Sequence, residues 1–238
     1  MASTKSDVIV FPQLPLPPKA PKLSNATSPY HFRLPYKLLS EVESKPPAFR
    51  KIQRNVFLCD PPAKISVDED TCVCVGNCGF SCHNYSVRTQ CNKSNCNVTA
   101  AKGDCGNRSF IRGSKVQVQT FHTLCAGWAL KTRQDMHSGQ FLMEYTGEVI
   151  SEEQYQERMK SNKEKREINY YIMELGSDAY IDAQKAGNVS RFMNHSCGPN
   201  IQTETWNVNG ERRIGNNIAT IMYLRMPQSA RCEVLCLT

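Results

Sequence analysis

Arg191-Phe192-Met193-Asn194-His195-Ser196-Cys197-Gly198-Pro199-Asn200 is the most specific phrase in the 238-residue sequence. Two shorter phrases precede it, Gly127-Trp128-Ala129 and Glu144-Tyr145-Thr146-Gly147-Glu148-Val149. Either short phrase alone is a weak signal, because its aromatic residue could equally belong to an ordinary core. His195 alone would more often be a buried, hydrogen-bonded histidine. Together, the three phrases indicate one functional region in the second half of the chain.

The same half of the chain has the pattern of a β-rich domain. After Phe110, short alternating apolar and polar pieces, such as 115–119 and 141–145, favour strands. One helix is expected to begin after Ser151, which precedes an acidic first turn, and to run to a basic end near Arg166. The expected fold class is therefore β-rich α+β, built of small sheets.

Seven of the 12 cysteines are crowded between positions 72 and 105. They are Cys72, Cys74, Cys78, Cys82, Cys91, Cys96 and Cys105. A structural zinc takes four thiolates, so seven suffice for two ions only if one thiolate bridges both. Metal would supply folding energy that this segment, which has no long apolar run, cannot obtain from packing. Disulfides are the alternative, but an odd number fits them poorly unless Cys59 or Cys125 joins, and both are expected to be buried thiols.

Composition places the chain among ordinary folded proteins. Hydrophobic residues make up 40% and charged residues 21%, and no stretch approaches the roughly 18 apolar residues of a membrane span. The N-terminus lacks the basic-then-apolar order of a signal peptide, so a soluble, intracellular protein without a membrane partner is expected. The net charge of +7 allows an acidic partner such as nucleic acid or chromatin, without proving one.

The N-terminal part divides into two stretches. Residues 1–30 contain a run of prolines and predict a flexible, disordered arm. Residues 31–66 are mixed, with an expected short helix at 36–44 and a basic and apolar stretch at 49–57. This second stretch is expected to be a lead-in segment that packs on later parts of the chain.

The three phrases resemble those of the SET domain, the fold of protein-lysine methyltransferases that use S-adenosylmethionine. The cysteine block resembles the AWS (associated with SET) module, which precedes SET in enzymes acting on lysine 36 of histone H3. The combination is most similar to the Ash1 group of that family, over roughly residues 47–215. The resemblance implies an AWS zinc module at 67–112, a SET domain at 113–215 that is incomplete at its C-terminus, and a divergent tail at 216–238.

The resemblance also implies which residues hold the cofactor and the substrate lysine. The cofactor-binding residues would be Gly127, Trp128, Tyr170, Arg191, Asn194 and His195. Of these, Asn194 and His195 would hold the adenine ring, and Arg191 would brace their loop. Tyr145 would be the catalytic residue, lining a narrow channel that excludes water and presents a deprotonated amine.

The cysteines are divided by the same resemblance between two structural zinc ions. One ion would be held by Cys72, Cys74, Cys78 and Cys82, and the other by Cys78, Cys91, Cys96 and Cys105. Cys78 would then be the bridging thiolate that a set of seven ligands requires.

The similarity ends after Gly215. The family continues with an apolar strand, a phrase that supplies a catalytic tyrosine, and a cysteine trio for a third zinc, whereas residues 216–238 read differently. Cys197 therefore lacks its usual partners, and no third zinc is expected. Ala129 stands where the family has glycine, which is expected to distort the turn at the cofactor.

The sequence supports three hypotheses about function. The first is a histone H3 lysine-36 methyltransferase acting on nucleosomes in the nucleus, for which the basic residues 160–166 are either a solvated face or a contact to nucleosomal DNA. The second is a truncated, non-catalytic SET protein that serves as a chromatin or protein interaction module, which the divergent tail favours. The third is a secreted disulfide protein. The sequence predicts no oligomeric state.

Overall fold

The structure is a computed structural model of the chain. It describes residues 45–65, 71–100, 104–123, 127–167, 169–176, 178–195, 199–219 and 236–237. The expected arm at 1–30 and the expected helix at 36–44 lie outside these residues. Among the helices that are described, none has both the length and the apolar character needed to cross a membrane.

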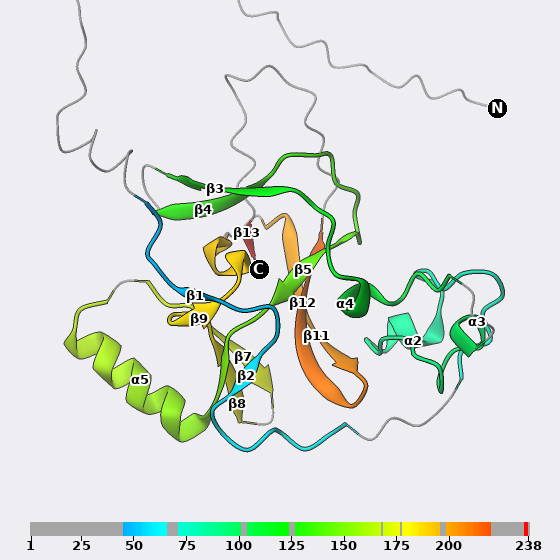
Figure 1. Ribbon diagram of the computed structural model, residues 1–238, viewed down its shortest axis with the longest axis horizontal. Helices are drawn as coiled ribbons and strands as arrows, with labels where there is room; N and C mark the ends of the chain where they lie inside the picture. Colours follow the sequence, from blue (N-terminus) through cyan, green and yellow to red (C-terminus); the bar gives the residue numbers. More distant parts are fainter. Residues whose placement is uncertain are drawn as a thin grey trace, which may run out of the picture. The chain divides into compact units, whose positions relative to one another are not determined.

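Short strands in small sheets dominate the second half of the chain (Figure 1). One sheet has the order β10-β13-β11-β12-β5, a second has the order β2-β6-β8-β7, and β1-β9 and β3-β4 form two further pairs. The strands are β1 (Arg50–Lys51), β2 (Val56–Phe57), β3 (Val118–His122), β4 (Trp128–Thr132), β5 (Phe141–Tyr145), β6 (Glu148–Ser151), β7 (Ile172–Gly176), β8 (Ala179–Asp182), β9 (Ala186–Gly187), β10 (Asn194–His195), β11 (Ile201–Val208), β12 (Glu211–Ile218) and β13 (Cys236–Leu237). The arrangement confirms the β-rich α+β fold class.

The lead-in segment joins these sheets by main-chain pairing. β1 runs parallel to β9, with Arg50 opposite Ala186. β2 runs parallel to β6, with Val56 opposite Glu148. Parallel strands must come from segments that are well separated along the chain, so these pairs fasten the lead-in to the later half.

The cysteine module, defined here as residues 71–100 and 104–112, consists mostly of loops. Its helices α2 (His83–Ser86), α3 (Asn97–Ala100) and α4 (Ser109–Arg112) have four residues each. Helices of that length are not stable alone. The core of the module consists of the seven cysteines with Val98 and Tyr85. The module and the long helix α5 lie on opposite sides of the sheets in Figure 1.

The β11–β12 hairpin has a turn that explains its register. Val208 pairs with Glu211, and the two turn residues, Asn209 and Gly210, have φ angles of 57° and 87°. A type I′ turn needs positive φ at both central positions, which is why Asn-Gly is preferred there. The turn sets the pairing along the whole hairpin, so β12 continues through Gly215 to Ile218.

Part of the predicted tail belongs to the same sheet. The boundary expected at Gly215 falls inside β12, and further along the chain β13 pairs in parallel with both β10 and β11. Asn194 lies opposite Cys236, and His195 lies opposite Leu237. The residues after Gly215 therefore complete the sheet that carries the Asn194-His195 phrase.

Two apolar clusters form the core around these sheets. The first contains Leu130, Met136, Leu142, Ile201 and Ile218, each at most 1% exposed. The second contains Tyr145, Val149, Leu175, Ile181 and Ile214. Because Leu142 and Tyr145 both lie on β5, this strand joins the two clusters and fixes Tyr145 between them.

The two predicted strands have different outcomes. β5 has the predicted bounds, whereas the strand expected at 115–119 begins later, at Val118. The partner strand β4 ends at Thr132, opposite Val118. Before that point Gln117 bonds instead to the bend that comes after β4, accepting from the main chain of Arg133 and donating to the side chain of Gln134.

Helix α5 (Glu152–Glu164) confirms the helix expected after Ser151. Ser151 and Gln154 form a capping box, in which each side chain accepts a hydrogen bond from the other residue's main-chain N–H. On the inner face, Tyr155 stacks on Tyr180 of β8 with ring centroids 4.2 Å apart. The helix is thus defined locally at its start and held on the sheet by its side chains.

A buried ion-pair network also ties α5 to the four-stranded sheet. Arg158 Nη1 donates to Glu148 Oε2 at 2.9 Å and to Asp182 Oδ2 at 2.6 Å. Asp182 is fully buried. A buried carboxylate is tolerated only while its partner is present, so the network makes the fold dependent on Arg158.

Replacing this arginine is expected to destabilise the fold strongly. Arg158→Met should lower the free energy of unfolding by about 3–5 kcal/mol, because it leaves the buried carboxylate of Asp182 unpaired. Urea unfolding measures the change. Lys160→Met, at an exposed position on the same helix, is the control and should change the free energy by less than about 0.5 kcal/mol. Equal effects of the two substitutions would contradict this account.

Candidate active site and metal centre

The residues expected to bind the cofactor and the lysine all line one cavity of about 600 Å³. They are Gly127, Trp128, Tyr145, Tyr170, Arg191, Asn194 and His195. They meet because β4 and β5 both pack against the 3-10 helix η1 (Val189–Phe192), which leads into β10. The volume lies within the roughly 300–1,000 Å³ of small-molecule sites.

The glycine turn at the start of β4 adopts the conformation that glycine permits. Gly127 has a φ of 64°, and Trp128 follows it with its ring edge-on to His122 across the β3–β4 pair, at 5.5 Å between centroids. Ala129 pairs with Phe121 inside β4, is fully buried, and is not among the residues with positive φ. The expected distortion by Ala129 is therefore absent from the strand, because that position does not need the freedom of glycine.

Tyr145 ends β5 with a buried, neutral hydroxyl. Its side chain is 3% exposed, and its O–H donates to the main-chain oxygen of Tyr171 at 2.8 Å. Burial, with a contribution from the charge of Asp182, raises the pKa of Tyr145 well above its usual range. The phenol thus stays protonated at neutral pH, and its oxygen keeps lone pairs that can accept a further hydrogen bond.

Arg191 is a buried cation held among aromatic rings. Its guanidinium lies 3.8 Å from the ring centroid of Tyr171 and 4.6 Å from that of Phe49. Nε donates to the carbonyl of Ala183 at 2.8 Å and Nη2 to that of Gln184 at 3.1 Å. Burial lowers the pKa of Arg191 from its ordinary value, but an arginine remains charged. These contacts fix the guanidinium beside the cavity, and the bracing role of Arg191 stays a prediction.

Two buried donors at the cavity have no partner among the described residues. These are Nη1 of Arg191 and Nδ2 of Asn194. An unsatisfied buried donor costs about 1–3 kcal/mol, so both atoms fit a ligand that brings hydrogen-bond acceptors. His195 and Tyr170 are exposed at the rim, Tyr170 by 50%. The residues present are thus suited to a polar small molecule such as the expected cofactor.

The cysteine sulfurs gather into two groups that could each hold a metal ion. The sulfurs of Cys72, Cys74, Cys78 and Cys82 lie within 4.8 Å of one another, and so do those of Cys72, Cys78, Cys91 and Cys96. The first group is the predicted set. In the second, Cys72 stands where the prediction has Cys105, although Cys105 is fully buried in the same cluster. Both Cys72 and Cys78 belong to the two groups, as a bridging thiolate would.

Hydrogen-bond donors point at these sulfurs. The side-chain amides of Asn84 and Asn107 each donate to Cys91 Sγ at 3.4 Å, and the main-chain N–H of Thr99 donates to Cys96 Sγ at 3.4 Å. Donors of this kind stabilise the thiolate, the form that binds metal. All seven thiols of the module are free, so the structure contains no disulfide between them.

The close packing of the cysteines shifts the pKa values of their thiols in opposite directions. Burial raises the pKa of Cys72 to about 11 and raises the pKa of Cys78 further. Burial also opposes the charge on Cys96, but hydrogen bonds from Thr99 outweigh it and lower that pKa to about 6. Several thiolates cannot share so small a volume without a cation, which makes the cluster suited to a thiophilic metal.

Comparison with known proteins identifies the part of the chain that forms the cavity. The SET domain family matches residues 127–221, which include every residue lining the cavity except Pro47 and His122. Residues 127–221 of the chain are a SET domain. The motif-based recognition is thereby confirmed.

Curated relatives of this SET-domain protein carry histone methyltransferase names. "Histone-lysine N-methyltransferase ASHR3" of Arabidopsis thaliana is 36% identical over 213 residues, which cover 87% of this chain and 39% of the relative. "Histone-lysine N-methyltransferase SETD2" of Homo sapiens is 41% identical over 139 residues, 58% of this chain and 5% of the relative. "Histone-lysine N-methyltransferase, H3 lysine-36 specific" of Homo sapiens is 35% identical over 185 residues, 73% of this chain and 7% of the relative. The chain thus spans well under half the length of these relatives.

Solved structures confirm the fold of the SET domain. "ctPRC2 in an autoinhibited conformation bound to S-adenosylmethionine" matches 70% of this chain and 23% of that chain, with a TM-score of 0.59 and 23% identity. "Crystal structure of the Chaetomium Thermophilum polycomb repressive complex 2 (PRC2)" matches 63% of this chain and 22% of that chain, with a TM-score of 0.55 and 22% identity.

Two side chains that contact the cavity residues Tyr145 and Arg191 were not expected from the motifs. Tyr171 accepts the hydrogen bond of Tyr145 and stacks on Arg191. Phe49, in the lead-in segment, also lies against the guanidinium of Arg191 and meets Phe192 edge-on at 5.8 Å between ring centroids. The Tyr170-Tyr171 doublet was a sequence signal that could have pointed to Tyr171. Phe49 gave no local signal, because its role depends on the β1–β9 pairing.

Proposed function

We propose that the chain is a histone-lysine N-methyltransferase that transfers methyl from S-adenosylmethionine to lysine 36 of histone H3 on nucleosomes. The single observation that carries the proposal is that all seven residues implied by the SET motifs line one cavity. The names of the relatives support a histone substrate, and one of them is named for lysine 36 of H3. A nuclear, chromatin-associated protein is part of the same proposal.

In this proposal the residues that bind the cofactor have different roles. The Gly127 turn and Trp128 form one wall, and Asn194 offers its unpartnered Nδ2 to an acceptor on the adenine ring. Arg191 braces the loop and offers Nη1 to a second acceptor. Tyr170 and His195 cover the rim. S-adenosylmethionine, when bound, would supply a methyl group on a sulfonium sulfur, which a neutral amine can attack while the neutral thioether leaves.

Tyr145 would orient the substrate amine and not deprotonate it. Its proton is engaged with Tyr171 and its raised pKa keeps the phenol neutral, so the oxygen acts as an acceptor for an amine N–H. When the amine N–H points toward Tyr145, the nitrogen lone pair can point toward the methyl group of the cofactor. Tyr145 thus acts by positioning the amine. The lysine would lose its proton to solvent before it enters the channel.

The chain's C-terminal segment also reaches this region. β13 pairs with β10, so the strand that carries Asn194 and His195 has a neighbour that connects it to β11. This pairing supports the enzyme over a SET remnant with an open site.

Two structural zinc ions are part of the proposal. Zinc is bound by four thiolates in a tetrahedron, and each of the two sulfur groups, which share Cys72 and Cys78, has four sulfurs. With Cys105 in place of Cys72 in the second group, Cys78 alone would be shared. The amide donors on Cys91 and Cys96 would then hold the ligands in place. The metal would replace the apolar core that the cysteine module lacks.

Metal analysis tests the shared ligand. We expect two zinc ions per chain, a loss of both in Cys78→Ser, and a loss of one in Cys74→Ser, because Cys74 belongs to a single group. Cys59→Ser, outside the module, is the control and should keep both ions. Equal losses from Cys78→Ser and Cys74→Ser would rule out the bridging role. Loss of both ions in Cys72→Ser as well would assign Cys72, and not Cys105, to the second ion.

Cofactor binding is expected to stabilise the fold. At 100 times its dissociation constant, S-adenosylmethionine should raise the free energy of unfolding by about 2.7 kcal/mol. Thermal unfolding with and without cofactor measures this gain. Asn194→Ala should remove it, and Asn92→Ala, in the cysteine module away from the cavity, should keep it. A gain that survives Asn194→Ala would show that the adenine site lies elsewhere.

The decisive test is transfer of labelled methyl from S-adenosylmethionine to recombinant nucleosomes. Label should reach histone H3 and disappear when lysine 36 is replaced by alanine. Tyr145→Phe should slow transfer at least tenfold, about 1.4 kcal/mol in the barrier, and leave the stabilisation by cofactor intact. Label that persists without lysine 36 would move the target to another lysine.

A non-catalytic interaction module is the second candidate. It is favoured by the end of the SET-family match at residue 221, since the resemblance places the family's catalytic tyrosine in the part that follows. Zinc-loaded protein that binds S-adenosylmethionine but transfers no methyl to any histone would establish this candidate. Either protein would contact nucleosomal DNA through exposed basic residues at the end of α5, and this contact should weaken as the salt concentration rises. These residues are Lys160, Lys163, Lys165 and Arg166.

A further inference from the structure

Asn188 connects two sides of the cofactor cavity, the one lined by Tyr145 and Asn194, without lining it. It comes directly before η1 and is half-buried. Together with Glu144 it lines a neighbouring cavity of about 460 Å³ instead. The proposed chemistry gives Asn188 no task, although its contacts reach the residues that enclose the cofactor cavity.

Both ends of the Asn188 amide are engaged, and by different elements. Nδ2 donates to the main-chain oxygen of Glu144, on β5, at 2.7 Å. Oδ1 accepts from the main-chain N–H of Ser190 at 3.0 Å and also from the Ser190 hydroxyl, which makes Asn188 the N-cap of η1. The amide therefore holds the strand with its donor and the helix with its acceptor.

The two elements carry different parts of the proposed reaction. Glu144 immediately precedes Tyr145, whose oxygen would accept a hydrogen bond from the substrate amine. η1 contains Arg191 and leads into Asn194, which would hold the adenine ring. The separation between β5 and η1 therefore helps to set the distance from the amine to the methyl group. Transfer needs these reacting atoms about 3–3.5 Å apart.

The main chain just before Asn188 lies unusually close to the end of β5. A Cβ atom at Gly187 would lie 2.8 Å from the main-chain oxygen of Thr146, so only glycine fits there. Gly187 is also held by the lead-in segment, because its main-chain oxygen accepts from the N–H of Ile52 at 2.9 Å. This close approach brings the amide of Asn188 within reach of the Glu144 carbonyl.

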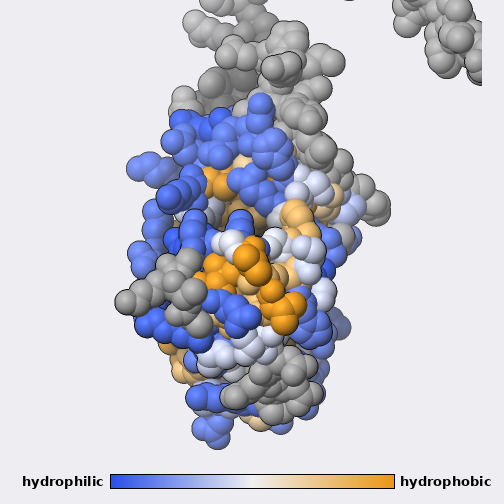
Figure 2. All heavy atoms as spheres, turned by 90° about the vertical axis from the view of Figure 1, so that its right-hand side faces the viewer, coloured by the Kyte–Doolittle hydropathy of each residue, from blue (hydrophilic) through white to orange (hydrophobic). Residues whose placement is uncertain are grey.

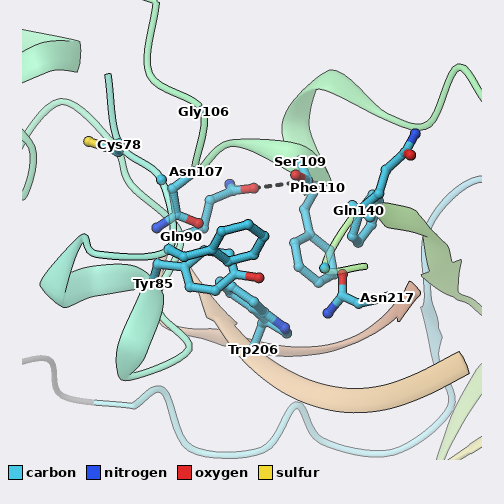
Figure 3. Close-up of a pocket in the computed structure, with 14 residues that line it drawn as sticks. Cys78, Tyr85, Gln90, Gly106, Asn107, Ser109, Phe110, Gln140, Trp206 and Asn217 are labelled. Carbon is cyan, nitrogen blue, oxygen red and sulfur yellow. Dashed lines mark hydrogen bonds between the residues drawn. The ribbon is translucent and has the colours of Figure 1, made fainter. Parts of the chain in front are cut away.

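The cysteine module also contacts β5, but through aromatic rings. Figure 2 shows the end of the molecule that carries this module, with hydrophobic side chains gathered in its middle. The ring of Phe110 lies 5.0 Å from that of Phe141 on β5 and 6.0 Å from that of Trp206 on β11. These rings line an aromatic cavity of about 220 Å³ (Figure 3). Apolar contacts are not directional, so they tolerate small shifts of the strand.

The direct packing of β5 on η1 is apolar as well. Leu142 of β5 and Phe192 of η1 belong to one buried cluster. The carboxylate of Glu144 is held by Arg213, which donates from Nε at 2.7 Å and from Nη2 at 2.5 Å, but Arg213 lies on β12 and fixes β5 to that strand. The Asn188 amide adds a directional link to η1, since a hydrogen bond has a preferred length and angle.

We propose that Asn188 is a positioning residue for methyl transfer, an inference that rests on the function proposed above. Its amide holds the Glu144 end of β5 at a fixed separation from η1. Tyr145 then presents the amine at the distance that the methyl group of the bound cofactor requires. Asn188 contacts neither cofactor nor substrate, so it acts on the rate of transfer and not on the affinity for the cofactor.

Asn188→Asp separates the two bonds of the amide. The carboxylate has the same shape and remains a good N-cap for Ser190, but it has no donor for the Glu144 carbonyl. The kcat for methyl transfer to nucleosomes should fall at least about tenfold, because the reacting atoms lose their alignment. The dissociation constant of S-adenosylmethionine, measured by calorimetry, should stay within about threefold, because η1 keeps its cap. Asn188→Ser, which also caps but is too short to reach Glu144, should behave alike and excludes the added charge as the cause.

Ser190→Ala is the matched control. It removes the hydroxyl bond to Asn188 Oδ1 but leaves the main-chain bond from Ser190 and the bond to Glu144. Since the link between β5 and η1 is kept, kcat should stay within about twofold of that of the unchanged chain. Circular dichroism shows whether each variant is folded.

An NMR measurement tests the positioning of Tyr145 without methyl transfer. The chain has nine tyrosines, so labelling with ¹³Cζ-tyrosine gives nine signals, and Tyr145→Phe assigns that of Tyr145. Asn188→Ser should move this signal, because the hydrogen bond from Tyr145 to the Tyr171 carbonyl adjusts when the end of β5 shifts. Ser190→Ala should leave the signal in place.

Three results would overturn the proposal. One is an unchanged kcat in Asn188→Asp and Asn188→Ser, which would leave Asn188 as a helix cap alone. Another is a loss of cofactor affinity in parallel with kcat, which would make Asn188 part of the cofactor site. The third is a Tyr145 signal that does not move in Asn188→Ser. If the unchanged chain transfers no methyl, the proposed function fails, and the NMR comparison still decides whether Asn188 positions Tyr145.

Discussion

The placement of one buried guanidinium holds the cofactor side of the molecule together. The guanidinium of Arg191 contacts the ring of Phe49 in the lead-in and the ring of Tyr171 in the stretch before β7. It also donates hydrogen bonds to the carbonyls of Ala183 and Gln184 in the turn after β8. Burying an arginine is costly unless its donors are satisfied and its face is covered. Carbonyls and ring faces both offset that cost here, so the remote lead-in has to meet the segments around residues 171, 183–184 and 191 at one point. This arrangement fixes the position of the adjoining strand, which contains Asn194 and His195.

The two halves of the described structure obtain their stability from different sources. The SET domain buries aliphatic side chains on both faces of its strands, as in the cluster of Leu130, Leu142, Ile201 and Ile218. The cysteine module buries sulfur instead, and its helices of four residues could not persist without a cross-link. A chelator should therefore unfold the module before it affects the sheets. Contacts such as that of Arg88 with Glu204 then determine how much of that loss reaches the SET domain.

Features that depend on neighbouring residues could be predicted from the sequence, whereas contacts between remote segments could not. The capping box at Ser151, the Asn209-Gly210 turn and the strand at 141–145 depend on neighbouring residues, and the motif residues around the cavity were named by resemblance. The start of β3 depends on where β4 ends, which no pattern within 115–119 reveals. The partner of Tyr145 and the role of Phe49 depend on pairings between remote segments. The same holds for the aromatic cavity at Trp206, whose walls come from separate parts of the chain.

The pairing of β10 with β13 has a consequence for the order of folding. β10 is an edge strand with β13 as its single neighbour in the described sheet, and β13 lies at positions 236 and 237. Loop closure between such distant residues is slow compared with the formation of α5 or the β11–β12 hairpin. A growing chain would therefore acquire its helix and its hairpin early, while Asn194 and His195 gain a fixed strand only after Cys236 and Leu237 have been made. The two motif residues are thus fixed later than the helix and the hairpin.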